Sequence, residues 1–440
     1  MSFKQLFSRG RARRRMAVVA ASGVLGLAGV IASARVPAEA GPSVSHPKRA
    51  GRGIVVGAAI ASLAVAGALA ASASTASAST ARSVGTLASC SWQPLSLING
   101  WRSEQSVYDS GNPSYCVTSD GMVYLSGSLA QPGGGSDEVA VLPPAAAPAS
   151  NLYLSVYTYG GTTGVLYIST SGEILAYSGA SGGGDTAFTS LAGISFPGTT
   201  VAQQPLPLLN GWQSAQSEYG TGNPSYSVTS DQVVHLSGSL NGSQITPGLS
   251  GEPGISANSP EKFAVLPSGA VPAACSSTET YTYGGVHGVL AFEPSGELDA
   301  YATGLGIYNT PSAEYTSLAG ISFPEASWAP STQALTLNAG WSASIDSGCA
   351  NSDFVGPGYT LIDGVVYLSG DMISSGSPNG TFATLPQAAR PTHTLYLTLN
   401  EGPADPASLE IDPDGNMTVF ASGAASGVNS LTGLSYQVSS

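Results

Sequence analysis

A short apolar segment that follows an aspartate recurs three times along the chain. The copies are Asp120–Gly127 (DGMVYLSG), Asp231–Gly238 (DQVVHLSG) and Asp363–Gly370 (DGVVYLSG). A turn of the Asp-Gly type before β-branched and aromatic residues is typical of a hairpin that feeds a strand. The pattern therefore predicts one β-hairpin that is written three times.

Other landmarks accompany each copy in a constant order: an opening Gly-Trp pair, a Leu-Pro pair and a closing Ser-Leu-x-Gly phrase. The landmark tryptophans, Trp101, Trp212 and Trp341, are 111 and 129 residues apart. Such spacings exceed those of solenoid or propeller repeats and suit independent domains. We predict three domains, called repeats 1, 2 and 3 below, at residues 93–198, 203–326 and 331–440.

Within repeat 1, polar and apolar residues alternate with a period of two, as in Leu152, Leu154 and Val156 against their neighbours. No helical period is visible outside the N-terminal region. This pattern predicts an all-β fold of three tandem antiparallel β-sandwich (jelly-roll-like) domains. The strands expected in repeat 1 lie near residues 115–118, 122–129, 138–142, 151–159, 165–170, 174–179 and 188–196.

The order of these motifs resembles the C-terminal receptor-binding or adhesion domains of bacteriophage tail and fibre proteins. The resemblance covers residues 93–440 as three units, and the version with Leu385-Pro386 and Arg390-Pro391 is nearest to that pattern. It implies a compact β-sandwich that commonly assembles as a trimer and contacts a host surface, and it implies no catalytic residue.

Three such units in one chain predict that the repeats pack around a common axis as an intrachain pseudo-trimer, so that the protein is a monomer. The alternative is three separate beads on short proline-rich linkers at residues 197–207 and 324–330.

The first 79 residues have the character of an export region, with apolar runs at residues 16–34 and 54–71, each after basic residues. We expect the second run to belong to a signal peptide that is cut near Ala76 or Ala78, which makes the protein secreted. The alternative keeps the first run as a membrane anchor, and the membrane is then contacted only through this uncleaved segment.

Charge is sparse and strongly acidic beyond residue 80. Charged residues make up 9% of the chain; ten of the 14 basic residues and one of the 27 acidic residues precede residue 80, which leaves 4 basic and 26 acidic residues and a net charge of −22. Such a surface repels phosphate backbones, so nucleic acid is not expected as a partner.

Four cysteines follow the export region, where an oxidising exterior favours disulfides. The pairing expected first is Cys90 with Cys116, which leaves Cys275 with Cys349, although three connectivities are possible. There is no Cys-x-x-Cys motif or Cys/His cluster, so neither structural zinc nor another cofactor is expected.

Aromatic residues are the best candidates for ligand binding. The phrase Tyr-Thr-Tyr-Gly-Gly places Tyr157 and Tyr159 in repeat 1, and Tyr281 and Tyr283 in repeat 2, beside a hairpin tip. These rings could stack on sugar faces while nearby carboxylates accept hydroxyl hydrogen bonds. The alternative is that they cover a sheet or an interface between repeats.

Catalytic patterns are weak. His235 occupies the position of Tyr124 and Tyr367, which indicates an ordinary strand side chain, and Asp412–Asn416 reads as a turn more than as a calcium loop. Carboxylate pairs such as Glu173 with Asp185 or Glu293 with Glu297 are expected by chance among so many acids. The protein is therefore not expected to be an enzyme.

Taken together, the patterns favour a secreted, non-catalytic adhesion protein that binds a surface ligand, a glycan or another component of a cell envelope. A structural protein of an extracellular layer is the alternative from another class, and a secreted hydrolase is the third.

Overall fold

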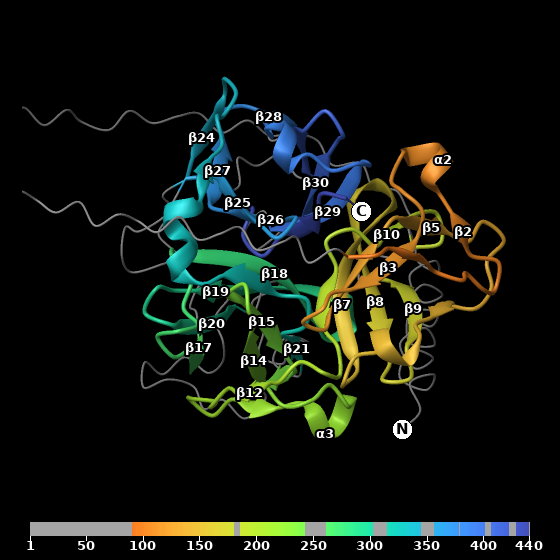
Figure 1. Ribbon diagram of the computed structural model, residues 1–440, viewed down its shortest axis with the longest axis horizontal. Helices are drawn as coiled ribbons and strands as arrows, with labels where there is room; N and C mark the ends of the chain where they lie inside the picture. Colours follow the sequence, from red (N-terminus) through yellow and green to blue (C-terminus); the bar gives the residue numbers. More distant parts are fainter. Residues whose placement is uncertain are drawn as a thin grey trace, which may run out of the picture. The chain divides into compact units, whose positions relative to one another are not determined.

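The computed structural model describes residues 90–179, 185–242, 261–301, 315–344, 356–377, 379–400, 406–421 and 428–439, which belong to one compact unit. The fold is predominantly β, built from antiparallel sheets that pair in a sandwich-like manner, as predicted (Figure 1). Within the described ranges, no helix has both the length and the apolar composition that crossing a bilayer requires. The predicted export region, residues 1–79, lies outside them.

Repeat 1 contains a four-stranded and a seven-stranded sheet. The four-stranded sheet has the order β1 (Gln93–Pro94), β3 (Ser114–Val117), β4 (Met122–Ser126), β11 (Ser195–Pro197). The seven-stranded sheet has the order β2 (Arg102–Ser103), β5 (Ser128–Ala130), β10 (Thr189–Ser190), β7 (Leu152–Thr158), β8 (Thr162–Ile168), β9 (Glu173–Ser178), β6 (Glu138–Val141). Short helical turns connect them: α2 (Gln105–Tyr108), η1 (Pro144–Ala146) and η2 (Tyr159–Gly161).

The same sheet orders return in repeats 2 and 3. In repeat 2 the four-stranded sheet is β12 (Gln204–Pro205), β14 (Ser225–Val228), β15 (Val233–Ser237), β22 (Ser322–Pro324). Its seven-stranded sheet is β13 (Gln213–Ser214), β16 (Ser239–Asn241), β21 (Thr316–Ser317), β18 (Ser276–Thr282), β19 (Val286–Phe292), β20 (Glu297–Tyr301), β17 (Glu261–Val265). The helical turns of this repeat are α3 (Gln216–Tyr219) and η3 (Tyr283–Gly285). In repeat 3 the four-stranded sheet is β23 (Gln333–Ala334), β25 (Gly358–Ile362), β26 (Val365–Ser369), β33 (Ser435–Gln437). Its seven-stranded sheet is β24 (Trp341–Ala343), β27 (Asp371–Ser374), β32 (Val428–Ser430), β29 (Leu395–Asn400), β30 (Pro406–Ile411), β31 (Asn416–Ala421), β28 (Gly380–Thr384), with η5 (Gln387–Ala389). The turn η4 (Ala326–Ser331) connects repeats 2 and 3.

Each repeat has its own apolar core between its two sheets. In repeat 1, Leu152, Leu154 and Val156 of β7 point into this core, and Val123 and Leu125 of β4 meet them from the smaller sheet. This is the alternation expected of strands with one face in a core. Trp101 and Trp212, 5% and 4% exposed, belong to the cores of repeats 1 and 2, and Trp341 packs against that of repeat 3.

The four-stranded sheets are buried on both faces, because their outer faces form a further apolar cluster. This cluster draws on all three repeats, with equivalent positions Met122, Val233 and Val365 and the rings of Tyr124 and Tyr367. Burial on both faces explains why the recurring Val-Val-Tyr-Leu segments lack alternation.

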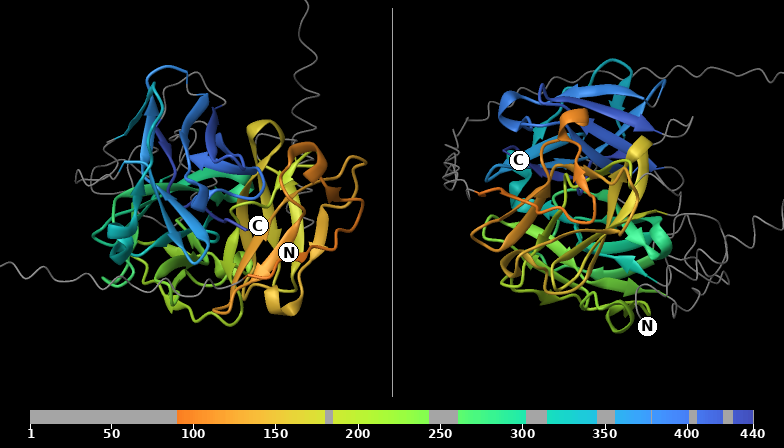
Figure 2. Two further views of the ribbon diagram at one scale, coloured as in Figure 1. Left: turned by 45° about the horizontal axis from the view of Figure 1, so that its top comes forward. Right: turned by 90° about the vertical axis from the view of Figure 1, so that its right-hand side faces the viewer.

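The strands β7, β18 and β29 hold equivalent places in the three repeats and contact one another pairwise. Figures 1 and 2 show the strands of the three repeats as groups coloured orange to yellow, yellow-green to teal, and cyan to blue. Segments far apart in the chain therefore meet at junctions between repeats.

The predicted disulfide between Cys90 and Cys116 is present, with 5.6 Å between the Cα atoms. It ties the segment before β1 to β3. Cys275 is also disulfide-bonded, whereas Cys349, its predicted partner, lies outside the described residues.

Element boundaries differ from the predicted ones where glycine turns interrupt a strand. The expected strand at residues 188–196 is two short strands, β10 and β11, in different sheets, and the expected strand 122–129 breaks at Gly127. The helices α2 and α3 were not predicted, because one helical turn is too short to display a 3.6-residue period.

We expect Gly127→Ala to destabilise the fold far more than Gly100→Ala. Both glycines have a positive φ, +88° and +80°, so both substitutions carry a backbone penalty of about 1–2 kcal/mol. At residue 127 the added Cβ would also lie 2.4 Å from the backbone of Asn112, whereas at residue 100 it would meet nothing within 4 Å. Denaturant unfolding of both variants measures the difference, and equal losses would contradict the packing described for Gly127.

His235 supplies a second prediction, because it is 3% exposed and burial lowers its pKa from 6.5 to about 4, despite the opposing charge of Asp120. Between these pH values the unfolded chain binds a proton that the folded chain does not, so stability is lost as the pH falls from 6.5 toward 4. The stability advantage of the wild type over His235→Gln should therefore shrink over this range by on the order of 3 kcal/mol.

Nearby carboxylates also titrate in this range, and burial is the main cause that raises the pKa of Asp231 and of Asp363. Their contribution to the pH dependence of stability is common to the wild type and the variant, so it cancels in the difference. Urea unfolding at several pH values provides the measurement, and a difference that is independent of pH would show that His235 is not buried in neutral form.

Candidate functional site

At the junction of repeats 1 and 2, one tyrosine of repeat 1 inserts among three rings of repeat 2. The ring centroid of Tyr153, on β7, lies 6.4 Å from Tyr219, 5.5 Å from Tyr281 and 5.4 Å from Tyr315. Tyr153 is 6% exposed. Offset and edge-to-face ring contacts of this kind stabilise an interface beyond the area they bury.

The same arrangement returns at the junction of repeats 3 and 1. Tyr396, which holds the place of Tyr153 on β29, lies 6.2 Å from Tyr108, 5.5 Å from Tyr157 and 5.3 Å from Phe188 between ring centroids. These three rings are the repeat 1 equivalents of the rings around Tyr153. The two junctions are thus built on the same plan.

Backbone hydrogen bonds repeat the correspondence. The amide of Asn151 donates to the carbonyl oxygen of Gly220 at 3.0 Å, and the amide of Thr394 donates to that of Asp109 at 2.9 Å. Asn151 and Thr394 precede equivalent strands, and Gly220 and Asp109 follow equivalent helical turns. These bonds fix the register of each junction.

The junction of repeats 2 and 3 is polar instead. Repeat 2 has Ser277 where the other repeats have a tyrosine, and the hydroxyl of Ser430 donates to the carbonyl oxygen of Ser277 at 2.6 Å. Aromatic insertion is therefore a property of two junctions.

An open hollow lies at the junction of repeats 3 and 1. Its volume is about 600 Å³, and we call it the junction hollow. Its lining consists of the one-turn helix α2, the residue that ends it, and one ring of repeat 3: Gln105, Ser106, Val107, Tyr108, Asp109 and Tyr396. Pockets of this volume are within the usual range for small ligands.

One substitution distinguishes this junction from its counterpart. In repeat 1, Tyr153 pairs across the sheet with Tyr167, and the two rings lie 4.9 Å apart. In repeat 3, Tyr396 pairs in the same way with Glu410. A ring that packs on its neighbour is thus replaced by a carboxylate next to Tyr396, the ring of repeat 3 that lines the junction hollow.

The electrostatics of the junction hollow follow from partial burial. Burial raises the pKa of Glu410, and the charge of Asp412 raises it further. The pKa values of Tyr396 and Tyr108 are also raised, in each case mainly by burial, so both phenols are neutral hydrogen-bonding groups near neutral pH. Tyrosine rings can stack on the apolar face of a sugar while carboxylates beside them accept hydrogen bonds from its hydroxyl groups.

The four tyrosines predicted as a ligand platform occupy different environments. Tyr157 is half-buried beside Tyr396, next to the junction hollow, and Tyr159 is 55% exposed at the hairpin tip. Tyr281 is 5% exposed and stacks on Tyr153, and Tyr283 lies 6.2 Å from Tyr219. The two pairs therefore do not form equivalent surfaces, since only the repeat 1 pair lies near rings that line the junction hollow: Tyr157 packs on Tyr396, and Tyr159 acts electrostatically on Tyr108.

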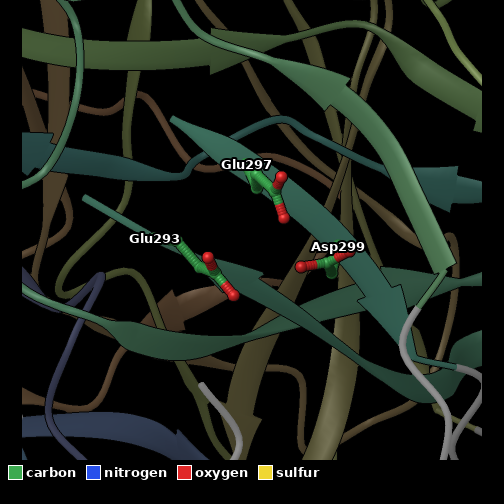
Figure 3. Close-up of side chains that lie close together, drawn as sticks. All are labelled: Glu293, Glu297 and Asp299. Carbon is green, nitrogen blue, oxygen red and sulfur yellow. The ribbon is translucent and has the colours of Figure 1, made fainter. Parts of the chain in front are cut away.

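Among the predicted carboxylate pairs, the structure brings Glu293 and Glu297 together with Asp299, with carboxylate oxygens within 4.8 Å of one another (Figure 3). Three such oxygens suit a hard cation. However, Lys262 on the neighbouring strand β17 forms an ion pair with Glu297 and supplies positive charge to the cluster.

The remaining candidates have structural surroundings. Glu173 is exposed, whereas Asp185 is buried and accepts a hydrogen bond from the hydroxyl of Ser178 at 2.7 Å. Asp412 accepts from the backbone amide of Asn416 at 3.0 Å, which is the hydrogen bond of a turn before β31. His235 lies on β15, in the four-stranded sheet of repeat 2.

A smaller cavity of about 70 Å³ is lined by β7, β18 and β29, including the equivalent residues Ser155, Glu279 and Thr398. This volume holds a few water molecules, not a sugar ring. The junction hollow is therefore the better candidate site.

Sequence reasoning did not select Tyr108, Asp109, Tyr396 or Glu410. Alignment of the repeats carries a signal for two of them, because Glu410 stands in the position of Tyr167 and Asp109 in that of Gly220. Each is a charged residue at a position where another repeat has an uncharged residue, so the fold does not require the charge. Their proximity to each other is visible only in the structure.

Asp109 adopts a left-handed backbone conformation (φ 51°), as Gly220 does in repeat 2 (φ 69°). We expect Asp109→Gly to change the free energy of unfolding by no more than about 1 kcal/mol, because relief of the unfavourable φ offsets the greater flexibility of glycine when unfolded. The reverse change, Gly220→Asp, should destabilise, since its Cβ would lie 2.8 Å from the side-chain nitrogen of Asn151. Thermal unfolding compares the two; a large loss in Asp109→Gly would assign its side chain a structural role.

Comparisons of this chain with protein-family models, with curated proteins and with solved structures gave no significant match.

Proposed function

We propose that this protein is a secreted, non-catalytic recognition protein that binds a glycan of a cell envelope or a similar surface. The observation that carries the proposal is the junction hollow, where the rings of Tyr108 and Tyr396 adjoin two carboxylates, Asp109 and Glu410. Ring faces suit the apolar faces of sugars, and carboxylates suit their hydroxyl groups.

The proposed organisation is a pseudo-trimer made by one chain. Its support is the closed cycle of junctions, in which repeat 1 inserts into repeat 2, repeat 3 into repeat 1, and repeat 2 contacts repeat 3. Likeness of the motifs to phage receptor-binding domains, which commonly form trimers, agrees with this organisation.

Export is supported by chemistry as well as by the N-terminal sequence. The Cys90–Cys116 disulfide is of the type that persists in oxidising surroundings. The two apolar runs after basic clusters at residues 1–79 supply the export signal in this proposal.

The test is binding of the full chain to a panel of immobilised cell-envelope glycans, followed by affinity measurements for the glycan that binds best. We expect Tyr396→Ala and Tyr159→Ala each to weaken binding, the former about tenfold, which corresponds to about 1.4 kcal/mol. Tyr159 is 55% exposed, so its variant should fold normally.

A matched control is Tyr167→Ala, which removes a half-buried ring from the other aromatic junction and should leave binding unchanged. Wild-type affinity in both Tyr396→Ala and Tyr159→Ala would exclude the junction hollow as the site. Ordered self-assembly with no glycan bound would support a structural layer protein instead, and turnover of a glycoside or ester would support a hydrolase.

A further inference from the structure

Glu410 is a half-buried carboxylate without a cationic partner in the part of the chain that the structure describes. The described residues form two ion pairs, Arg102 with Glu104 and Lys262 with Glu297, and neither includes Glu410. Removal from water raises the pKa of Glu410, so the carboxylate is held in surroundings that disfavour its charge. A positively charged group placed beside it would reverse that disadvantage.

The rings near Glu410 add a second attraction for a cation. Tyr396 lies directly across the sheet from Glu410, and its centroid is 5.5 Å from that of Tyr157 and 6.2 Å from that of Tyr108. An ammonium group over a tyrosine face is attracted by the electron-rich ring, by about 0.5–2 kcal/mol depending on exposure. The Glu410 carboxylate and the face of Tyr396 are therefore neighbouring groups that both attract a cation.

Asp109 provides another negative charge at the rim. It is exposed, it lines the junction hollow, and it occupies a left-handed position that repeat 2 fills with Gly220. An aspartate in place of glycine brings backbone strain with it. The rim of the junction hollow thus carries a negative charge at a backbone position where glycine would be less strained.

The described residues include few positively charged side chains that could bind an anionic ligand. Their lysine and arginine side chains are Arg102, Lys262 and Arg390, and each already has a partner: Glu104, Glu297 and the carbonyl oxygen of Leu385. A net charge of −22 beyond residue 80 repels anionic polymers at a distance and attracts cationic ones.

We infer that the junction hollow selects glycans that carry free or methylated amines, with the ammonium group between the Glu410 carboxylate and the ring of Tyr396. This inference rests on the proposed function, because it names the class of glycan that the same site takes. Glycans with acetylated amines should bind more weakly, and those with carboxylates or phosphates should be excluded.

The experiment titrates the full chain with three glucosamine oligosaccharides of equal length, in which the amine is free, acetylated or trimethylated. The trimethylated form keeps its charge at every pH, so its pH profile reports the protein alone. We expect the two cationic forms to bind about tenfold more tightly than the acetylated form. Added salt should reduce this preference.

Glu410→Gln should abolish the preference with little effect on stability, because it removes the charge and keeps the shape. For the wild type, affinity for the trimethylated form should fall as the pH is lowered through the raised pKa of Glu410, and this fall should be much smaller in the variant, in which Asp109 and Asp412 are the carboxylates that remain. Glu218→Gln, an exposed carboxylate on α3 at the other aromatic junction, is the matched control and should behave as wild type.

The outcomes separate the two proposals. Equal or tighter binding of the acetylated form, or selection of a neutral or acidic glycan on the panel, would overturn the inference about amines and leave glycan recognition in place. Failure to bind any glycan would overturn both. A preference for amines that survives in Glu410→Gln would also overturn the inference, since the charge would then act elsewhere.

Discussion

Burial of the four-stranded sheets on both faces is the constraint on which the rest of the structure depends. In β4, Val123 and Leu125 serve the core of repeat 1, while Met122 and Tyr124 serve the cluster shared by all three repeats. A strand with two apolar faces is not stable beside water, so each repeat requires its neighbours. The junctions, including the one that forms the hollow, are a consequence of that requirement.

The three junctions share one backbone arrangement but differ in the side chains at equivalent positions. A tyrosine on the second position of the central strand inserts among rings in two junctions, and Ser277 replaces it in the third. Where the cross-strand neighbour is Tyr167, the ring packs on Tyr153; where it is Glu410, a carboxylate lies beside the rings instead. Divergence at positions outside the repeat cores thus leaves the fold intact and changes the surface.

The sequence alone was sufficient for the elements whose signal is local. The period-two pattern around Leu152 predicted the β fold, the glycine turns predicted the hairpins, and the position of Cys90 near the first strands predicted its bond to Cys116. Boundaries such as the split at residues 188–196 were missed, because a strand that passes from one sheet to the other has the same local composition as a continuous one. The platform residues Tyr157 and Tyr281 look equivalent in sequence, yet one is half-buried and the other fully buried.

What the sequence determined is therefore the longer strands of the repeated unit, their faces and their threefold repetition, since these follow from residue periods of a few positions. Only the tertiary structure decided which tyrosines are covered, that Asp109 and Tyr396 share a hollow, and that Glu410 adjoins them. The physical reason is that contacts across a junction depend on how whole repeats pack, and side chains from distant parts of the chain leave no joint pattern in the local sequence.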